Sequence, residues 1–449
     1  EVAGKAHDVL EKEFGEPSEV LVATARHGFI AGALQETVAH GGDSSDHSFT
    51  MKLDSLLTGK WLGFPLLILI LLAVFQLTFT LGAYPQEWIE TGVNALCGWI
   101  RSSLPAGWFT SLLTDGIIQG VGSVISFLPN IVILFFFLSL LEDTGYMSRA
   151  AFLMDKIMHM VGLHGRSFIP MLIGFGCNVP AIMAAKQIEN TRDRTLTMLM
   201  IPFMSCSARL PVYLLFVSAF FPRHKALVMV SLYAIGIFLS IVFAFVMKHT
   251  KWFRMQDEDY VSVLPPFRKP TWRNTGMHIW ERVYDYLQKI STVILAASVI
   301  IWALEYFPAD KTRNGEEPEE SYLAMVGKAM SPVMEPLGFD WKMNVSLLTG
   351  LPAKEAIVST MGILYNGSAD EEEGGRNLAT VLREEKIFTP ATAWAFMLFV
   401  LLYFPCVATV STLRKEVGAR WASFVVVNSL VLAWLMAFLT FRFVSLLPL

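Results

Sequence analysis

Three of the four cysteines occupy comparable places in the sequence. Cys177 lies in an apolar stretch that Gly and Pro interrupt, and Cys206 and Cys406 lie in apolar stretches that follow two such interruptions. Thiolates combined with oxygen or nitrogen ligands suit transition metals rather than alkali ions, Mg²⁺ or Ca²⁺. A lone cysteine in a membrane helix is also a common small apolar filler. The shared placement, which Cys97 lacks, is what favours a metal path.

Lys354 and Glu355 are the only adjacent charges within a core apolar segment, where one charge costs about 2.5–3.5 kcal/mol at a helix centre. We expect Glu355 to ligate a cation or carry a proton. Lys354 would hold its hairpin in place or balance the charge after the cation leaves. The two could also form a mutually neutralising structural pair, or reach the membrane interface. Asn178 offers a neutral oxygen ligand, and Arg209 is expected to fix helix position through backbone carbonyls. The candidate metal ligands are Cys177, Cys206, Cys406, Glu355 and Asn178.

The two interrupted segments, near 168–186 and 343–365, are expected to be re-entrant. A broken helix leaves backbone groups that must find partners in protein or water, so it belongs inside a bundle or beside a cavity. We assign gating or structural roles to residues in these segments and in the helices that follow them: Gly174, Gly176, Pro180, Arg209, Pro211, Gly350, Pro352, Lys354 and Pro405.

The elements that must position these residues are membrane-spanning helices. Hydrophobic residues make up 54% of the 449 residues and charged residues 16%, against roughly 25% charged in soluble domains. Stretches long enough to cross about 30 Å of hydrocarbon recur at 61–83, 119–141, 195–221, 226–247, 289–307, 391–411 and 422–447. The formal charge of −4 gives no support to nucleic-acid binding. The predicted fold class is an all-α polytopic membrane protein.

Loop charges predict the orientation, because Lys and Arg are enriched in cytoplasmic loops. If both interrupted segments turn back without crossing, the N-terminal residues 1–48 and the basic loop 248–288 lie in the cytoplasm. The acidic stretches 308–341 and 366–389 then lie outside, as does the C-terminus. Residues 1–48 read as a short helical segment that ends in a Gly/Asp/Ser linker.

An internal repeat relates two parts of the chain. Met154, Met158, Gly162 and Gly174 recur 176 positions later as Met330, Met334, Gly338 and Gly350. In the predicted topology the two halves, 119–247 and 289–421, enter the membrane from opposite sides and are inverted. Paired Gly/Pro-interrupted segments in inverted halves point to a transport site near the bilayer midplane.

The motifs that carry the cysteines resemble those of the ferrous iron transport protein B family. They are Gly174-Phe175-Gly176-Cys177-Asn178-Val179-Pro180-Ala181, Ser205-Cys206-Ser207-Ala208-Arg209-Leu210-Pro211-Val212-Tyr213, Gly350-Leu351-Pro352-Ala353-Lys354-Glu355 and Pro405-Cys406-Val407-Ala408-Thr409. The resemblance implies two Gate repeats, of a type shared with nucleoside transporters. Segment 49–118 would hold the first transmembrane helix and an outer loop, and 422–449 the last helix. Residues 1–48 would be the tail of a cytosolic helical domain similar to a guanine-nucleotide-dissociation inhibitor.

The resemblance also implies a function, transport of Fe²⁺ across a bacterial-type cytoplasmic membrane into the cell. The resemblance further implies an N-terminal GTPase domain that regulates or drives transport, and small cytosolic accessory proteins of the same transport system as partners. These 449 residues contain no phosphate-binding loop, so GTP and Mg²⁺ are expected only with that domain, and no cofactor is expected in this chain. One alternative is a nucleoside or another small organic solute. A more remote one is a membrane-embedded metalloenzyme, although HExxH is absent.

Overall fold

The computed structural model describes residues 62–105, 107–250, 272–307, 321–366, 378–384 and 388–445, with a few isolated positions outside these ranges. All of its described helices belong to one compact unit, Leu57–Leu449. The predictions for residues 1–48 lie outside the described residues. Within the described ranges the backbone forms helices and short turns and no strand, which confirms the all-α class.

The first half of the described chain contains ten α-helices. They are α4 (Gly63–Ser103), α5 (Trp108–Ser111), α6 (Gln119–Asp143), α7 (Tyr146–Val161), α8 (Phe168–Ile173), α9 (Asn178–Ala185), α10 (Thr191–Met200), α11 (Leu210–Phe220) and α12 (Lys225–Lys248), followed by α13 (Trp272–Tyr306). A π-helical turn, Leu112–Ile118, joins α5 to α6. The remaining helices are α15 (Tyr322–Met334), α16 (Trp341–Thr349), α17 (Ala356–Asn366), α18 (Leu378–Glu384), α19 (Pro390–Leu402), α20 (Val407–Val417) and α21 (Ala419–Ser445).

Six helical segments of the described chain are long and apolar enough to cross a membrane: 63–103, 108–143, 191–220, 225–248, 390–417 and 419–445. They overlap six of the seven predicted spans. The seventh, 289–307, lies in α13, whose apolar part is the shorter stretch Val293–Tyr306. A polytopic membrane protein is therefore what the helices support.

The outer loop predicted within segment 49–118 is wrong, because the described part of that region forms a helical hairpin with α6. α4 continues through Pro85 to Ser103 and packs along α6. Gly82 permits the close approach, since a Cβ there would lie 1.7 Å from Asn130 Oδ1. Asn130 Nδ2 donates a hydrogen bond of 2.7 Å to Gln86 Oε1, which ties the helices together just after the proline. Packing against α6 thus compensates for the hydrogen bond that a helix-interior proline removes.

The predicted loop 248–288 is also shorter than expected, because α13 begins at Trp272.

Two spans predicted as continuous, 195–221 and 391–411, are each interrupted. α10 ends at Met200 and α11 begins at Leu210, with 3₁₀ turns and extended residues between them. α19 and α20 are separated by extended residues around Pro405. Proline cannot donate a backbone hydrogen bond and pushes the preceding residue out of the helical region. The described residues therefore contain four interrupted segments, whereas two were predicted.

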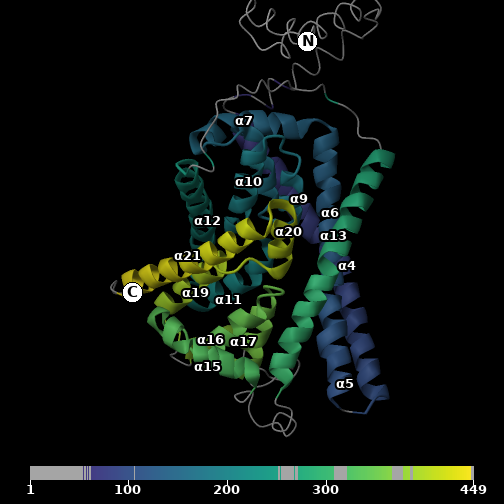
Figure 1. Ribbon diagram of the computed structural model, residues 1–449, viewed down its shortest axis with the longest axis vertical. Helices are drawn as coiled ribbons and strands as arrows, with labels where there is room; N and C mark the ends of the chain where they lie inside the picture. Colours follow the sequence, from purple (N-terminus) through teal and green to yellow (C-terminus); the bar gives the residue numbers. More distant parts are fainter. Residues whose placement is uncertain are drawn as a thin grey trace, which may run out of the picture. The chain divides into compact units, whose positions relative to one another are not determined.

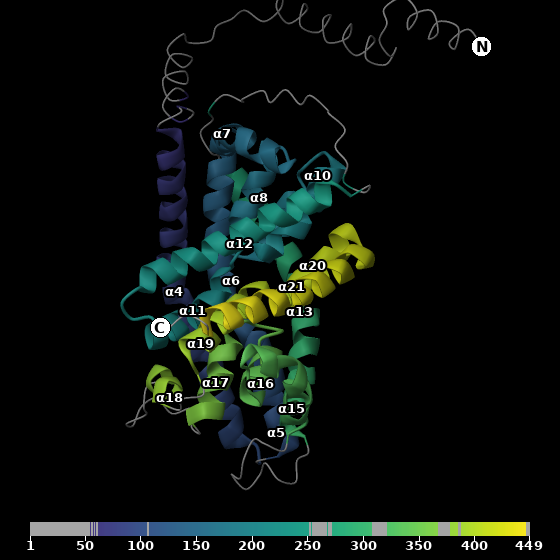
Figure 2. The same ribbon diagram turned by 90° about the vertical axis from the view of Figure 1, so that its left-hand side faces the viewer.

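The two halves share features at matched positions. Gly162 and Gly338, 176 positions apart, both end a helical turn in the left-handed region, with φ of 86° and 79°. Asn190 and Thr389 cap α10 and α19 with their side chains. α7 and α10 lie toward one end of the unit and α15, α16 and α17 toward the other (Figures 1 and 2). These features are those that the repeat predicts, and the inverted relation of the halves stays a prediction.

α19 lies at the centre of the second half. Its residues are buried on nearly every side, including Phe396, Met397, Val400 and Leu401. A helix that is hydrophobic all round must be covered by other helices, and α21 and α12 pack against it. The segment that ends at Cys406 is therefore held deep inside the unit.

Candidate metal-transport site

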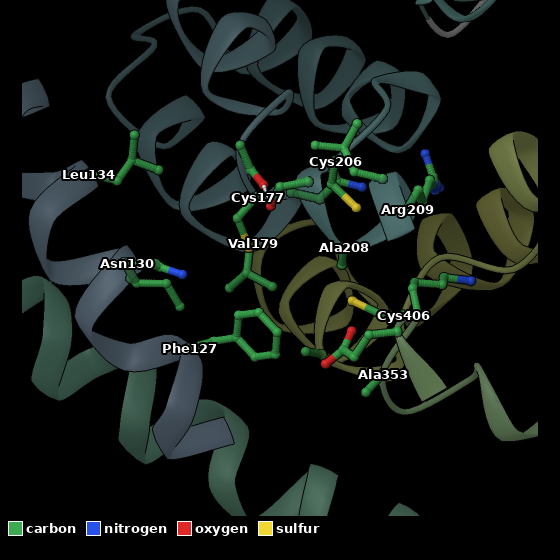
Figure 3. Close-up of a pocket in the computed structure, with 18 of the residues that line it drawn as sticks. Phe127, Asn130, Leu134, Cys177, Val179, Cys206, Ala208, Arg209, Ala353 and Cys406 are labelled. Atoms are coloured by element: carbon green, nitrogen blue, oxygen red, sulfur yellow. Dashed lines mark hydrogen bonds between the residues drawn. The ribbon is translucent and has the colours of Figure 1, made fainter. Parts of the chain in front are cut away.

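A cavity of about 340 Å³ lies where the four interrupted segments meet α4 and α6. The side chains in Figure 3 converge on it from both halves of the protein. Its lining includes all five predicted metal ligands: Cys177, Cys206, Cys406, Glu355 and Asn178. Residues more than 200 positions apart in the sequence thus line the same cavity.

Each of the three cysteines lies at the junction where an interruption ends and a helix begins. Cys177 precedes α9, Cys206 precedes a 3₁₀ turn that leads into α11, and Cys406 precedes α20. All three have extended ψ angles, of 132°, 160° and 151°. The extended backbone removes them from the helical cylinder, and all three line the cavity as free thiols. Cys97 is a buried thiol on α4 that does not line it.

The thiols do not form a closed metal cage. Within the part of the chain that the structure describes, no three His, Cys, Asp or Glu side chains are arranged to hold a metal ion together. Cys406 Sγ lies 3.0 Å from Thr409 Oγ1, within its own helix. A conducting site needs binding that is weak enough for release. The sparse donor set fits a path better than a storage site.

Asn178 contributes an oxygen without a hydrogen-bond partner among the described residues. The residue is 5% exposed and lines the cavity, and no described donor bonds to its Oδ1. Leaving a buried acceptor unpaired costs about 1–3 kcal/mol. Asn178 is the first residue of α9, so this oxygen is anchored next to Cys177. An unpaired buried carbonyl beside a thiol is the donor arrangement that a cation would complete.

Lys354 is buried at the cavity wall, with 2% of its surface exposed. Its Nζ donates a hydrogen bond of 2.7 Å to the carbonyl oxygen of Phe404 and lies 3.3 Å from the centre of the Tyr403 ring. It therefore does not extend to the surface. Its described contacts are with the interruption between α19 and α20, and no ion pair joins it to the neighbouring Glu355 among the described side chains.

Arg209 is 1% exposed and also lines the cavity. Its Nη1 donates to the carbonyl oxygen of Met204 at 3.0 Å, and its Nη2 lies 3.5 Å from that of Pro202. These are carbonyls that the interruption between α10 and α11 leaves without helical partners. Arg209 thus stabilises the interrupted backbone of its own segment.

The interrupted segments are also joined in pairs through their backbones. Ser207 donates from its N–H and its hydroxyl to the carbonyl oxygen of Gly176, at 3.2 and 2.9 Å. Val407 N–H donates to the carbonyl oxygen of Leu351 at 3.2 Å. Each re-entrant segment is thus pinned to the interruption that follows it in the same half.

The predicted glycines and prolines serve this tight packing. A Cβ at Gly174 would lie 2.9 Å from the Met171 carbonyl oxygen, one at Gly176 3.2 Å from Phe75 and Leu134 side chains, and one at Gly350 2.5 Å from Ile357 Cγ1. Pro180 and Pro211 lie in the first turns of α9 and α11, where no helical N–H bond is lost. Pro352 lines the cavity, and Pro405 lies in the second-half interruption.

One wall of the cavity was not among the predicted site residues. Phe75, Gln86, Phe127 and Asn130, from α4 and α6, line it, and Figure 3 shows Phe127 and Asn130 across the cavity from Arg209 and Cys406. An amide side chain, Asn130, in the middle of the apolar span 119–141 was the available signal. Its Oδ1 is packed against Gly82, so its described role is to hold α4 and α6 together.

Comparison with known proteins agrees with the motifs. A family model described as nucleoside recognition, the Gate model, matches residues 124–220 and 287–420, and a model of the ferrous iron transport protein B C terminus matches residues 229–282. A relative named Fe(2+) transporter FeoB, from Campylobacter jejuni, is 42% identical over 92% of this chain and 68% of its own length. The chain belongs to the ferrous iron transport protein B family.

Other members of the family match to a similar extent. A Fe(2+) transport protein A/Fe(2+) transporter FeoB fusion protein from Porphyromonas gingivalis is 45% identical over 95% of this chain and 55% of its own length. The Fe(2+) transporter FeoB of Methanocaldococcus jannaschii is 37% identical over 95% of this chain and 63% of its own. The chain thus spans between 55% and 68% of these relatives. No solved structure matches it.

Proposed function

We propose that this chain moves Fe²⁺ across the cytoplasmic membrane into the cell through the cavity between its interrupted segments. The observation that carries the proposal is the meeting of three thiols, one carboxylate and one unpartnered amide oxygen in a single cavity. Sulfur combined with oxygen favours a transition metal over alkali and alkaline-earth ions. The names of the relatives, Fe(2+) transporters, support iron as the ion.

Within this proposal the residues have distinct roles. Cys177, Cys206 and Cys406 form a sulfur-lined path, and Glu355 and Asn178 supply oxygen ligands beside it. The glycines and prolines keep backbone turns close to the cavity, and the two halves act as inverted repeats around it. The chain itself performs no catalytic step.

The rest of the transport system lies beyond these residues. A GTPase domain preceding residue 1 would bind GTP and Mg²⁺ and bias the gate from the cytoplasmic side, where the N-terminus is proposed to lie. Small cytosolic accessory proteins would act on that domain. A nucleoside site would call for amide, carboxylate and aromatic groups instead of thiols. An organic solute is less favoured, because three thiols line this cavity and the relatives are named for iron.

Iron flux tests the proposal. This chain is reconstituted in liposomes under anaerobic, reducing conditions, and Fe²⁺ entry is compared with that of the double variant Cys206→Ser, Cys406→Ser. We expect flux to fall at least about tenfold, because a serine hydroxyl is a poor replacement for a soft thiolate ligand. The matched control is Cys97→Ser, which alters a buried thiol outside the cavity.

Undiminished flux in the double variant would refute the thiol path. If neither protein conducts, the assay is repeated with the GTPase domain of a relative restored in front of residue 1. Iron flux that then appears and depends on Cys206 and Cys406 supports the proposal, and continued absence of iron flux contradicts it.

A further inference from the structure

Lys354 differs from an ordinary buried lysine in what surrounds its ammonium group. Nζ is held by the Phe404 carbonyl oxygen at 2.7 Å and faces the Tyr403 ring at 3.3 Å from its centre. A carbonyl oxygen and an aromatic face are both groups that attract cations. Cys406 and Glu355, two of the proposed iron ligands, line the same cavity. The ammonium thus occupies a cation-binding position next to the proposed path of the ion.

The two buried cations of the cavity are connected differently. Arg209 binds carbonyls of its own segment. Lys354 lies in the interruption between α16 and α17 and reaches across to the interruption between α19 and α20. Its contact therefore joins two segments, and any movement of one segment relative to the other changes it.

The charges in the cavity also oppose a divalent ion. Arg209 and Lys354 bring two positive charges, whereas Glu355 is the one Asp or Glu side chain in the described lining. In a site with restricted water, a like charge a few ångströms away raises the free energy of a bound cation strongly. A positive charge beside a path of sparse donors lowers the affinity of each donor that the ion meets, which favours release of the ion.

We propose that Lys354 is a resident cation that competes with the transported ion. Its ammonium lies against Phe404 and Tyr403 when the ion is not bound, and it weakens metal binding so that the ion can leave. The inference rests on the proposed function, since it requires a divalent metal as cargo.

Three substitutions separate the charge of Lys354 from its hydrogen bond. Lys354→Gln keeps a donor for the Phe404 carbonyl and removes the charge. Lys354→Met removes both, and Lys354→Arg keeps both. The matched control is Lys342→Met, because Lys342 lies on α16, faces the Tyr365 ring at 4.9 Å and does not line the cavity.

The measurement is titration of the purified chain with Co²⁺, a stable stand-in for Fe²⁺, followed by its thiolate-to-metal absorption. If the Lys354 ammonium competes with the metal ion, the Lys354→Gln and Lys354→Met variants should bind Co²⁺ about tenfold more tightly than the unmodified chain. Lys354→Arg and Lys342→Met should stay within about threefold of the unmodified chain. Fe²⁺ release from liposomes preloaded through the Gln variant should be slower.

A purely structural role of Lys354 predicts that its substitution does not strengthen Co²⁺ binding. If Lys354 only fastened two segments together, Lys354→Met would weaken Co²⁺ binding and Lys354→Gln would leave it unchanged. Either result in a variant that elutes as a folded protein overturns the inference, and the Gln variant decides if the Met variant aggregates. An unmodified chain that binds neither Co²⁺ nor Fe²⁺ instead contradicts the proposed function, so the two failures are distinguishable.

Discussion

At the scale of single residues, the site contains two polar groups that are unusual in an apolar protein interior. Asn178 keeps a buried oxygen without a hydrogen bond, and Lys354 carries a charge into the wall of a cavity. The unpaired oxygen of Asn178 reduces stability unless a cation or another donor binds it, whereas the ammonium of Lys354 is stabilised by the Phe404 carbonyl oxygen. Asn178 is therefore better explained by cation binding than by packing, and Lys354 by a cation position that the protein fills itself.

Asn178→Ala tests this explanation. Removing an unpaired buried oxygen should leave the melting temperature of the chain unchanged or slightly raised, because no hydrogen bond is lost. Co²⁺ affinity should fall by roughly 3- to 30-fold, about 0.7–2 kcal/mol, as expected for one neutral ligand. Thermal unfolding and Co²⁺ titration of the same sample measure both.

Asn344→Ala is the matched control for that variant. Asn344 is fully buried and also has an unpaired Oδ1, but its Nδ2 donates to the Gly327 carbonyl oxygen at 3.1 Å, and it does not line the cavity. It should lose about 1 kcal/mol of stability with no change in Co²⁺ affinity. Lower stability and unchanged affinity in Asn178→Ala would mean that the amide is structural.

At the scale of elements, interruption rather than length is what makes the site. Four helical segments stop near the middle of the unit, and three of them place a cysteine where the backbone is extended. Glycine at the interruption allows neighbouring segments to approach, and proline ends the helix where it must end. The tyrosine hydroxyl of Tyr403 donates to the Gly350 carbonyl oxygen at 3.3 Å, which links the two interruptions of the second half.

Gly350→Ala should disrupt that link. The added Cβ would lie 2.5 Å from Ile357 Cγ1 and 2.8 Å from Tyr403 Oη, so both must move, and Tyr403 carries the ring beneath Lys354. Overpacking of this kind costs about 1–3 kcal/mol. We expect a lower melting temperature together with reduced Fe²⁺ flux.

Gly362→Ala provides the comparison within α17. A Cβ at Gly362 meets nothing within 4 Å, and alanine favours a helix over glycine by about 1 kcal/mol. Stability should be unchanged or higher, with normal flux. Equal effects of the two alanines would show that the close approach at Gly350 has no special role.

At the scale of the whole molecule, the cavity exists because two halves contribute to it. Cys177, Cys206 and Asn178 come from the first half, and Cys406, Lys354 and Glu355 from the second. α7 and α15 follow the corresponding parts of the two halves and lie toward opposite ends of the unit (Figure 2). With an inverted repeat, these ends face opposite sides of the membrane.

Labelling from one side tests the inversion. Met160 of α7 and Met325 of α15 are 69% and 57% exposed. We expect a membrane-impermeant maleimide to label Met160→Cys only from the cytoplasmic side of oriented vesicles and Met325→Cys only from the outer side. The unmodified chain is labelled in parallel, and the signal from its own cysteines is subtracted. Reaction of both positions from the same side would contradict the inverted arrangement.

The class of the protein and five of the residues that line its cavity could be predicted from the sequence alone. Apolar stretches of about 20 residues have few alternatives to membrane helices, so the class follows from composition and length. Cysteines beside Gly/Pro interruptions identified the groups that line the cavity, because soft ligands and broken helices are both unusual inside a membrane. Such signals are local, and local sequence is enough to detect them.

The tertiary structure decided what depends on partners distant in the chain. Whether 84–103 forms a loop or a helix depends on α6, which packs against it through Gly82 and Asn130. The position of Lys354, on a carbonyl and a ring about 50 residues away, depends on how the interrupted segments approach one another. Adjacent charges in the sequence suggested a pair with Glu355. In the fold, the ammonium group is instead held by the Phe404 carbonyl oxygen and the Tyr403 ring. A buried charge is stabilised by the polar groups that surround it in space, whatever their distance along the chain.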